Sequence, residues 1–267
     1  MSTVRPPLPR EHGVWVMLMV TVLAGLAAVS TFFDTGAAVF YTVAVVLSHL
    51  ARPALVELVT ARSIPTRRGA AAWLLAYALA GVAAAAVLLL VYHRWWLLVV
   101  AAGGAGAAAM DVARSVRRQP QSIPVQAAGA AAMALFAPGA YYAASARLDN
   151  AALALAIGMA AHLVSRVWVV TAHVHWRRAP VLDLATRWRY AWPGPAIVLA
   201  GLAAALAVDA AGGGPARWVW AVGLDLIMAT ASVMHGPRDT PFRALGVQQT
   251  ITSVLFSTIL VVTLRIP

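Results

Sequence analysis

The chain contains no cysteine and no lysine, and it has few charged residues of any kind. Without cysteine it forms no disulfides, has no thiol chemistry and cannot bind a metal through thiolates. Charged residues make up 11% of its 267 residues, whereas soluble globular chains have about 25%. Hydrophobic residues make up 62%, and the mean hydropathy of +0.79 is too high for a surface that faces water. These values exclude a soluble enzyme, a disordered chain and a secreted disulfide-rich scaffold, and they predict a multi-pass membrane protein.

The positive charge comes from 20 basic residues, all arginine, against nine acids, which gives a net charge of +11. In a soluble protein such an excess would suggest a nucleic-acid partner. Here the arginines lie in short gaps between apolar runs, a pattern typical of the links between membrane helices. We therefore expect a lipid bilayer as the partner, and no nucleic acid.

Nine apolar segments reach or approach the roughly 20 residues that a membrane-spanning helix needs. They are residues 13–32, 37–59, 69–92, 95–113, 123–144, 151–172, 194–211, 216–235 and 244–264. These segments fill nearly the whole chain and predict a single transmembrane domain over residues 1–267, an all-α bundle of nine helices. Pro138 in the fifth segment and Pro53 in the second predict kinks, because proline cannot donate a helical hydrogen bond.

The arginines are divided unevenly between the two ends of these segments. A cytoplasmic N-terminus places 16 arginines on the cytoplasmic side and 4 on the other side. Cytoplasmic links of membrane proteins carry the excess of basic residues. The sequence therefore predicts an N-terminus inside the cell and arginine-rich loops on the cytoplasmic side.

Polar and ionisable residues gather in the half of the helices predicted to face the cytoplasm. Such residues are costly in hydrocarbon and are functional candidates by default. The candidates for lining a pocket on this side are Glu11, His12, His49, Arg52, Asp111, Arg114, His162, Arg166, Asp225 and Gln248. The alternative is a set of structural ion pairs, with long side chains that reach the membrane interface.

One polar stripe follows from helical geometry on the sixth predicted helix. His162, Arg166 and His173 fall within about 40° of one another at 100° per residue. This stripe is expected to face the bundle interior, where Arg166 pairs with a carboxylate. The carboxylates considered as its partner are Glu11, Asp111 and Asp225.

Three glycines give the fourth predicted helix a thin face, that is, a surface without side chains. They are Gly103, Gly104 and Gly106. Small residues at such spacing indicate close packing against another helix. A substrate groove beside this face is the alternative.

Three ligand chemistries are open. A metal or haem could use imidazole ligands, although the chain has no CxxCH or HExxH spacing. An anionic ligand, such as a diphosphate or a lipid head group, could bind the arginine-rich loops together with Arg52, Arg114 and Arg166. A proton or ion path could use Asp225, His162 and Gln248. Nucleophilic catalysis is not indicated, because no GxSxG motif or Ser-His-Asp arrangement is recognisable.

The segment Leu8–Trp15 reads LPREHGVW and is the most distinctive motif of the chain. This Pro-x-Glu-His-Gly-x-Trp start of a first membrane helix resembles the YwiC-like family of bacterial membrane proteins. Phe242–Gln248 and the basic link Arg114–Arg118 are similar to that family too, so the resemblance extends over the whole chain. It implies a multi-pass protein of the bacterial cytoplasmic (inner) membrane and no particular reaction.

A weaker resemblance is to the intramembrane prenyltransferases of the UbiA superfamily. Those proteins have nine helices, a cytoplasmic N-terminus and an active site on the cytoplasmic side. Their aspartate-rich motifs hold Mg²⁺, which holds the substrate diphosphate. The corresponding segments here, residues 48–57 and 173–193, have one carboxylate each, Glu57 and Asp183. The resemblance implies a UbiA-like fold, and the missing aspartates disfavour Mg²⁺-dependent prenyl transfer.

The sequence as a whole thus predicts a membrane-embedded protein with a polar pocket near the cytoplasm. We expect the pocket to bind an isoprenoid-type lipid, a quinone or haem, with no Mg²⁺. A divergent UbiA-type prenyltransferase is the first alternative. A structural or assembly subunit of a membrane complex is the second.

Overall fold

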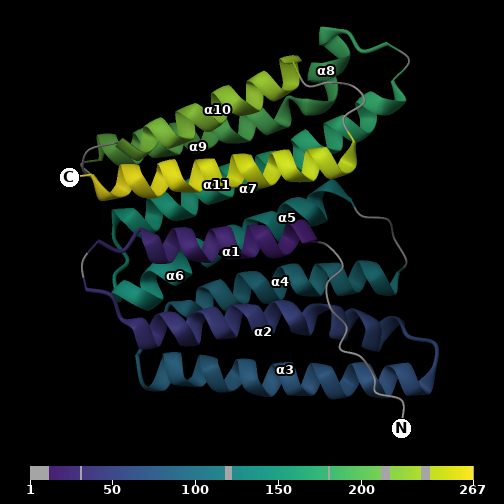
Figure 1. Ribbon diagram of the computed structural model, residues 1–267, viewed down its shortest axis with the longest axis vertical. Helices are drawn as coiled ribbons and strands as arrows, with labels where there is room; N and C mark the ends of the chain where they lie inside the picture. The colour runs from purple at the N-terminus through teal and green to yellow at the C-terminus, as the bar shows by residue number, and fades with distance from the viewer. Residues whose placement is uncertain are drawn as a thin grey trace.

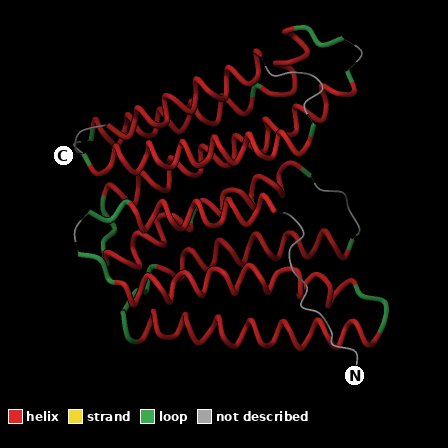
Figure 2. The backbone as a smooth tube through the Cα atoms, viewed as in Figure 1, coloured by secondary structure: helices red, strands yellow, loops and turns green. Residues whose placement is uncertain are grey.

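The computed structural model describes residues 12–30, 32–117, 122–179, 181–211, 217–235 and 241–266. Within these ranges the chain forms helices joined by short links, and no strand (Figure 2). The helices are α1 (His12–Ala27), α2 (Thr35–Thr60), α3 (Ile64–Leu90), α4 (Leu97–Val116), α5 (Ile123–Ala134), α6 (Phe136–Ser145), α7 (Asn150–Arg178), α8 (Leu184–Ala191), α9 (Pro193–Ala210), α10 (Arg217–His235) and α11 (Phe242–Arg265).

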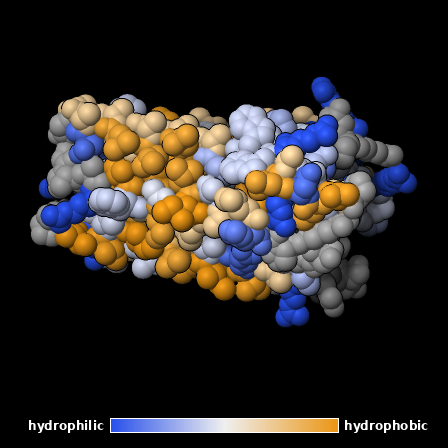
Figure 3. Space-filling view, turned by 90° about the horizontal axis from the view of Figure 1, so that it is seen from above, coloured by the Kyte–Doolittle hydropathy of each residue, from blue (hydrophilic) through white to orange (hydrophobic). Residues whose placement is uncertain are grey.

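Eight helical segments in the described ranges are long and apolar enough to cross a membrane, with α5 and α6 counted as one segment. The predicted first span, residues 13–32, is a shorter helix that ends at Ala27. Its 16 residues extend about 24 Å at 1.5 Å per residue, less than the roughly 30 Å of a hydrocarbon core. On the face shown in Figure 3, hydrophobic residues cover much of the middle of the molecule, and the most hydrophilic residues lie towards its two ends. The chain is a multi-pass helical membrane protein.

The helices lie side by side in an elongated array, with α3 at one edge and α9 and α10 at the other (Figure 1). Helix α7 is central, because it contacts α1, α5, α6, α8, α9, α10 and α11. Its side chains His162, Arg166 and His173 are all buried. The predicted polar stripe therefore faces protein, which confirms that part of the sequence analysis.

The predicted fifth span is divided into α5 and α6 at Leu135. Pro138 explains the break, because it has no N–H to donate to the carbonyl of Ala134, the last residue of α5. The kink predicted at this proline is confirmed. Helix α2 is different: it continues through Pro53 as one helix of 26 residues.

A glycine that the sequence did not single out lets two helix backbones approach each other closely. A Cβ atom on Gly25 of α1 would lie 2.0 Å from the carbonyl oxygen of Ala137 in α6. By contrast, a Cβ atom on Gly104 or Gly106 would meet nothing within 4 Å. The close packing predicted for the α4 glycines is therefore wrong at these two positions. Gly103 is different, because a Cβ atom there would lie 2.8 Å from Cδ1 of Leu135, the residue between α5 and α6.

Polar contacts at both ends of α6 hold that helix in place. The backbone N–H of Asp34, just before α2, donates to the carbonyl of Ala144 at 2.8 Å. The Asp34 carboxylate pairs with Arg94, whose Nε donates to the carbonyl of Ala143. The hydroxyl of Tyr41 donates to the carbonyl of Phe136 at 3.0 Å. These bonds fix the backbone of α6 relative to α2.

Candidate functional site

Alternating helix directions bring most arginines to one end of the array. The C-terminal ends of α2, α4, α7 and α10 and the N-terminal ends of α3, α5, α9 and α11 meet there (Figure 1). We name it the arginine-rich end, and the described arginines on its side are Arg52, Arg62, Arg67, Arg68, Arg114, Arg117, Arg177, Arg178, Arg187, Arg189 and Arg243. The opposite, arginine-poor end has Arg94, Arg147, Arg217 and Arg265.

Two arginines from neighbouring helices converge on one aspartate near the arginine-rich end. Asp111 of α4 accepts from Arg52 of α2, with the Arg52 Nη2 and Nε atoms 2.8 Å and 3.0 Å from Oδ2. Its other oxygen, Oδ1, pairs with Arg114, one turn further along α4. These three residues form the Asp111 cluster, which carries one net positive charge.

His49 lies one helical turn before Arg52 on α2 and belongs to the same region. Its side chain is buried, and its Nε2 atom hydrogen-bonds to no described residue. Trp15 of α1 packs edge-on against the imidazole, with the ring centroids 4.8 Å apart. This contact brings the start of α1 beside His49.

The most distinctive motif of the chain falls mostly outside the described residues. Glu11 is not among them, and His12 is described only as the first residue of α1. The expectation that both side chains line a pocket together with His49 and His162 is therefore untested. Trp15, three residues beyond His12, is the described part of the motif that contacts His49.

A second buried group joins α7, α10 and α11 deeper in the array. His162 of α7 lies between Asp225 of α10, 3.0 Å from Nδ1, and Ser253 of α11, 2.8 Å from Nε2. Arg166, one turn along α7, pairs with the same Asp225 oxygen. His162, Asp225 and Ser253 are completely buried, and Arg166 is 4% exposed. We name these four residues the Asp225 network. The predicted pairing of Arg166 with a carboxylate is confirmed, with Asp225 as the partner.

The hydrogen-bond donors in this network follow from charge. An ionised Asp225 only accepts, so His162 donates from Nδ1, and in the neutral imidazole Nε2 then accepts the hydroxyl proton of Ser253. This is the bonding order of a Ser-His-Asp nucleophile, which the sequence analysis did not detect. However, Ser253 is completely buried, and Phe256 stacks on the imidazole with the ring centroids 4.4 Å apart. No room is left at Ser253 for a substrate, so the arrangement acts as a clamp between three helices.

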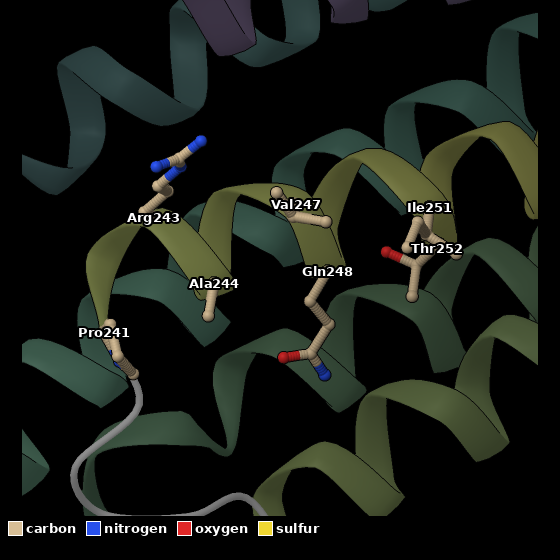
Figure 4. Close-up of a pocket in the computed structure, with 7 residues that line it drawn as sticks. All are labelled: Pro241, Arg243, Ala244, Val247, Gln248, Ile251 and Thr252. Atoms are coloured by element: carbon tan, nitrogen blue, oxygen red, sulfur yellow. The ribbon is translucent and has the colours of Figure 1, made fainter.

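Gln248 is placed differently from the other polar candidates. It lies on the exposed face of α11, where Pro241, Arg243, Ala244, Val247, Ile251 and Thr252 line a shallow, mainly apolar groove with it (Figure 4). Gln249, the next residue, is the buried glutamine, and it shares a helix face with Ser253 four residues later. A spacing of four residues on α11 was the signal that could have identified Gln249 and Ser253.

The histidines differ in their capacity to hold a metal or haem iron. Both ring nitrogens of His162 are engaged by Asp225 and Ser253. Nδ1 of His173 forms a hydrogen bond of 2.8 Å with the carbonyl oxygen of Val169. His49 keeps a buried Nε2 without a described partner. Among the residues that the structure describes, no group of three His, Cys, Asp or Glu side chains could hold a metal ion.

The structure therefore divides the predicted site residues into two groups with no ion pair or hydrogen bond between them in the described ranges. His49, Arg52, Asp111 and Arg114 lie together between α2 and α4, beside the start of α1. His162, Arg166 and Asp225 lie together between α7, α10 and α11.

Comparison with known proteins identifies the first half of the chain. The model of the family described as YwiC-like protein matches residues 8–141, half of the chain. This range includes the LPREHGVW motif, His49 and the whole Asp111 cluster, and it ends before the Asp225 network. No curated protein and no solved structure matches the chain. On the family match, the chain belongs to the YwiC-like protein family.

Proposed function

We propose that this protein binds a hydrophobic small molecule with an oxygen-bearing head group at the arginine-rich end, beside His49 and the Asp111 cluster. The observation that carries the proposal is the buried, unpartnered Nε2 atom of His49, next to two arginines that share one aspartate. Burying a polar atom without a partner costs about 1–3 kcal/mol. A ligand that accepts or donates a hydrogen bond there would remove this cost.

The charge of the cluster favours a head group that accepts hydrogen bonds. Arg52 and Arg114 together carry two positive charges, and Asp111 neutralises one of them. The Arg52 side chain is 38% exposed, so it can turn part of its guanidinium towards a ligand. Trp15 supplies an apolar wall on the α1 side. This combination suits a molecule whose body lies in hydrocarbon and whose polar end reaches the arginines.

An isoprenoid-type lipid, a quinone and haem all fit this description. The oxygens of a quinone or of an isoprenoid head group would accept from His49 and Arg52. Were the ligand haem, His49 would hold its iron through Nε2 and Arg52 would hold a propionate, because both ring nitrogens of His162 are already engaged. Haem would supply redox chemistry or ligand binding at its iron.

Binding is better supported than UbiA-type prenyl transfer. Asp183, the carboxylate of the second matching segment, caps α8 by accepting from the backbone N–H of Thr186 at 2.7 Å. The hydrogen bonds from Thr186 lower the pKa of this carboxyl and keep it ionised in its capping role. Asp183 and Glu57 supply one carboxylate each, too few for a Mg²⁺–diphosphate clamp of the aspartate-rich type.

The ligand is tested by native mass spectrometry of the protein purified in mild detergent. We expect the wild type to carry a bound small molecule, and His49→Ala and Arg52→Gln to lower its occupancy roughly ten- to hundredfold, the equivalent of one lost charged or buried hydrogen bond. The matched controls, His235→Ala and Arg62→Gln, remove the same groups from exposed positions at the same end and should retain the ligand. A visible haem spectrum distinguishes haem from the two colourless or weakly coloured ligand classes.

Two results would contradict the binding proposal. One is a wild-type protein that carries no small molecule under conditions in which it is folded. The other is equal occupancy in His49→Ala, Arg52→Gln and their controls.

We propose the following topology for the same protein. The chain forms one transmembrane domain over residues 1–267 with nine spans, as in the UbiA arrangement, and α1, although its described part is shorter than the other eight, is the ninth spanning helix. The arginine-rich end faces the cytoplasm of a bacterium, so the N-terminus lies inside and the C-terminus lies outside. The support for this orientation is the arginine excess at one end.

Single cysteines placed in this cysteine-free chain report its sidedness. Val181 and Leu148 are exposed residues in links at the arginine-rich and arginine-poor ends, 66% and 53% exposed respectively. Leu148→Cys is expected to react with a membrane-impermeant maleimide in intact cells, and Val181→Cys only after permeabilisation. Reaction of Val181→Cys in intact cells would reverse the proposed orientation.

A further inference from the structure

The C-terminal part of α7 and the short helix α8 form a basic structure at the arginine-rich end. Helix α7 has 29 residues and extends about 43 Å, more than the roughly 30 Å of a hydrocarbon core. Its last turn, which contains His175, Arg177 and Arg178, therefore reaches the depth of the lipid head groups. Helix α8 packs back against α7 (Figure 1).

A pocket of about 360 Å³ lies between these two helices. Its lining residues are His175, Arg178, Ala179, Val181, Thr186, Arg189 and Tyr190. Three of these side chains are basic and none is a carboxylate. The imidazole of His175 stacks on the ring of Tyr190 with the centroids 4.6 Å apart, and the guanidinium of Arg189 lies 5.8 Å from the same ring. The imidazole of His175 and the guanidinium of Arg189 are therefore both held against the ring of Tyr190.

Neighbouring charged residues do not neutralise this pocket. Within the described part of the chain, no ion pair involves Arg178 or Arg189. Arg187 is directed elsewhere, over the ring of Trp176 and to the carbonyl of Val233. Asp183 is the carboxylate closest in sequence, and it is bonded to the N-terminus of α8.

We propose that this pocket binds the phosphate of an anionic phospholipid from the surrounding bilayer. Arginine pairs with phosphate through charge-assisted hydrogen bonds, and basic pockets at the ends of membrane helices bind anionic head groups. Apolar residues beside the pocket favour a lipid over a soluble phosphate compound. Val181, Leu184 and Trp192 are each more than half exposed, which suits contact with acyl chains and the membrane interface.

The site is separate from the one in the proposed function. It lies on α7 and α8, whereas His49 and the Asp111 cluster lie on α2 and α4. The lipid would anchor α8 to the membrane surface and hold the end of α7. His49→Ala is therefore expected to leave this lipid bound, so the two proposals can fail independently.

Nanodiscs with and without phosphatidylglycerol in phosphatidylcholine test this inference. We expect native mass spectrometry to detect phosphatidylglycerol retained by the wild type in preference to phosphatidylcholine. The double variant Arg178→Gln/Arg189→Gln should reduce this preference about tenfold while the protein stays folded, as judged by its thermal midpoint in neutral nanodiscs. The control, Arg62→Gln/Arg68→Gln, removes the same charge from exposed positions in the α2–α3 link and near the start of α3, and it should keep the preference.

Three outcomes would overturn the proposal. Equal retention of the two lipids by the wild type would show that there is no anionic site. An equal loss of preference in the control would mean that the general surface charge, and not the pocket, selects the lipid. Stabilisation of the protein in neutral nanodiscs by inorganic phosphate alone, lost in the double variant, would identify a site for a soluble anion.

Discussion

Replacing Asp225 with alanine is expected to destabilise the protein more than any other single change of a polar residue. The substitution removes the partner of Arg166 and of His162 together, since both use the same carboxylate oxygen. An unpaired arginine in the middle of a membrane helix costs at least about 2.5–3.5 kcal/mol, and breaking a buried ion pair costs about 3–5 kcal/mol. Whole domains are stable by only about 5–15 kcal/mol. We expect a large fall in the thermal midpoint in detergent and little monodisperse protein.

Two further variants show whether the loss of stability in Asp225→Ala comes from leaving Arg166 buried without a partner or from the loss of any one acidic residue. Asp209→Ala removes an aspartate near the end of α9 that forms no ion pair in the described ranges, and it should melt like the wild type. Arg166→Met/Asp225→Leu removes both charges, and hydrophobic replacement of a buried pair is often nearly neutral. This double variant should therefore recover most of the stability lost in Asp225→Ala. A wild-type midpoint for Asp225→Ala, or no recovery in the double variant, would show that Asp225 does not act through Arg166.

The helical architecture could be predicted from sequence. A membrane helix forms all its backbone hydrogen bonds within itself, and it is recognisable in the sequence as a long apolar run. The eight helical segments capable of crossing a membrane correspond to eight of the nine predicted segments. Pro138 marked the break between α5 and α6 for the same local reason. Helix α8 was not predicted, because eight residues of mixed polarity give no signal in a search for membrane spans.

Helical periodicity predicted which side of α7 faces protein. It did not predict which residues of other helices contact that side. Arg166 had three candidate partners, and only the packing of α10 against α7 selects Asp225. Ser253 was missed because a serine on an apolar helix is not unusual, and its role depends on the imidazole that reaches it from another helix. Gln248 and Gln249 could not be told apart for a similar reason. They are adjacent on α11, yet Gln248 lines the exposed groove and Gln249 is buried in the interior.

Gly25→Ala is expected to have the second-largest effect, although it adds a single methyl group. The added Cβ atom would lie 2.0 Å from the carbonyl oxygen of Ala137 and 2.8 Å from the Cβ atom of Ala140. The obstacle is backbone, and α6 cannot retreat without breaking the bonds from Tyr41 and Asp34 that hold it. Helix α1 must therefore move away from α6. Overpacking of this kind costs about 1–3 kcal/mol.

Gly104→Ala is the matched control, because the chemical change is identical and the surroundings are empty. A Cβ atom at Gly104 would meet nothing within 4 Å. Alanine is favoured over glycine inside a helix by about 0.8–1.0 kcal/mol, so this variant should be unchanged or slightly more stable. The two substitutions are thus expected to shift the thermal midpoint in detergent in opposite directions. Equal midpoints for both variants would mean that α1 and α6 are not in close backbone contact at Gly25.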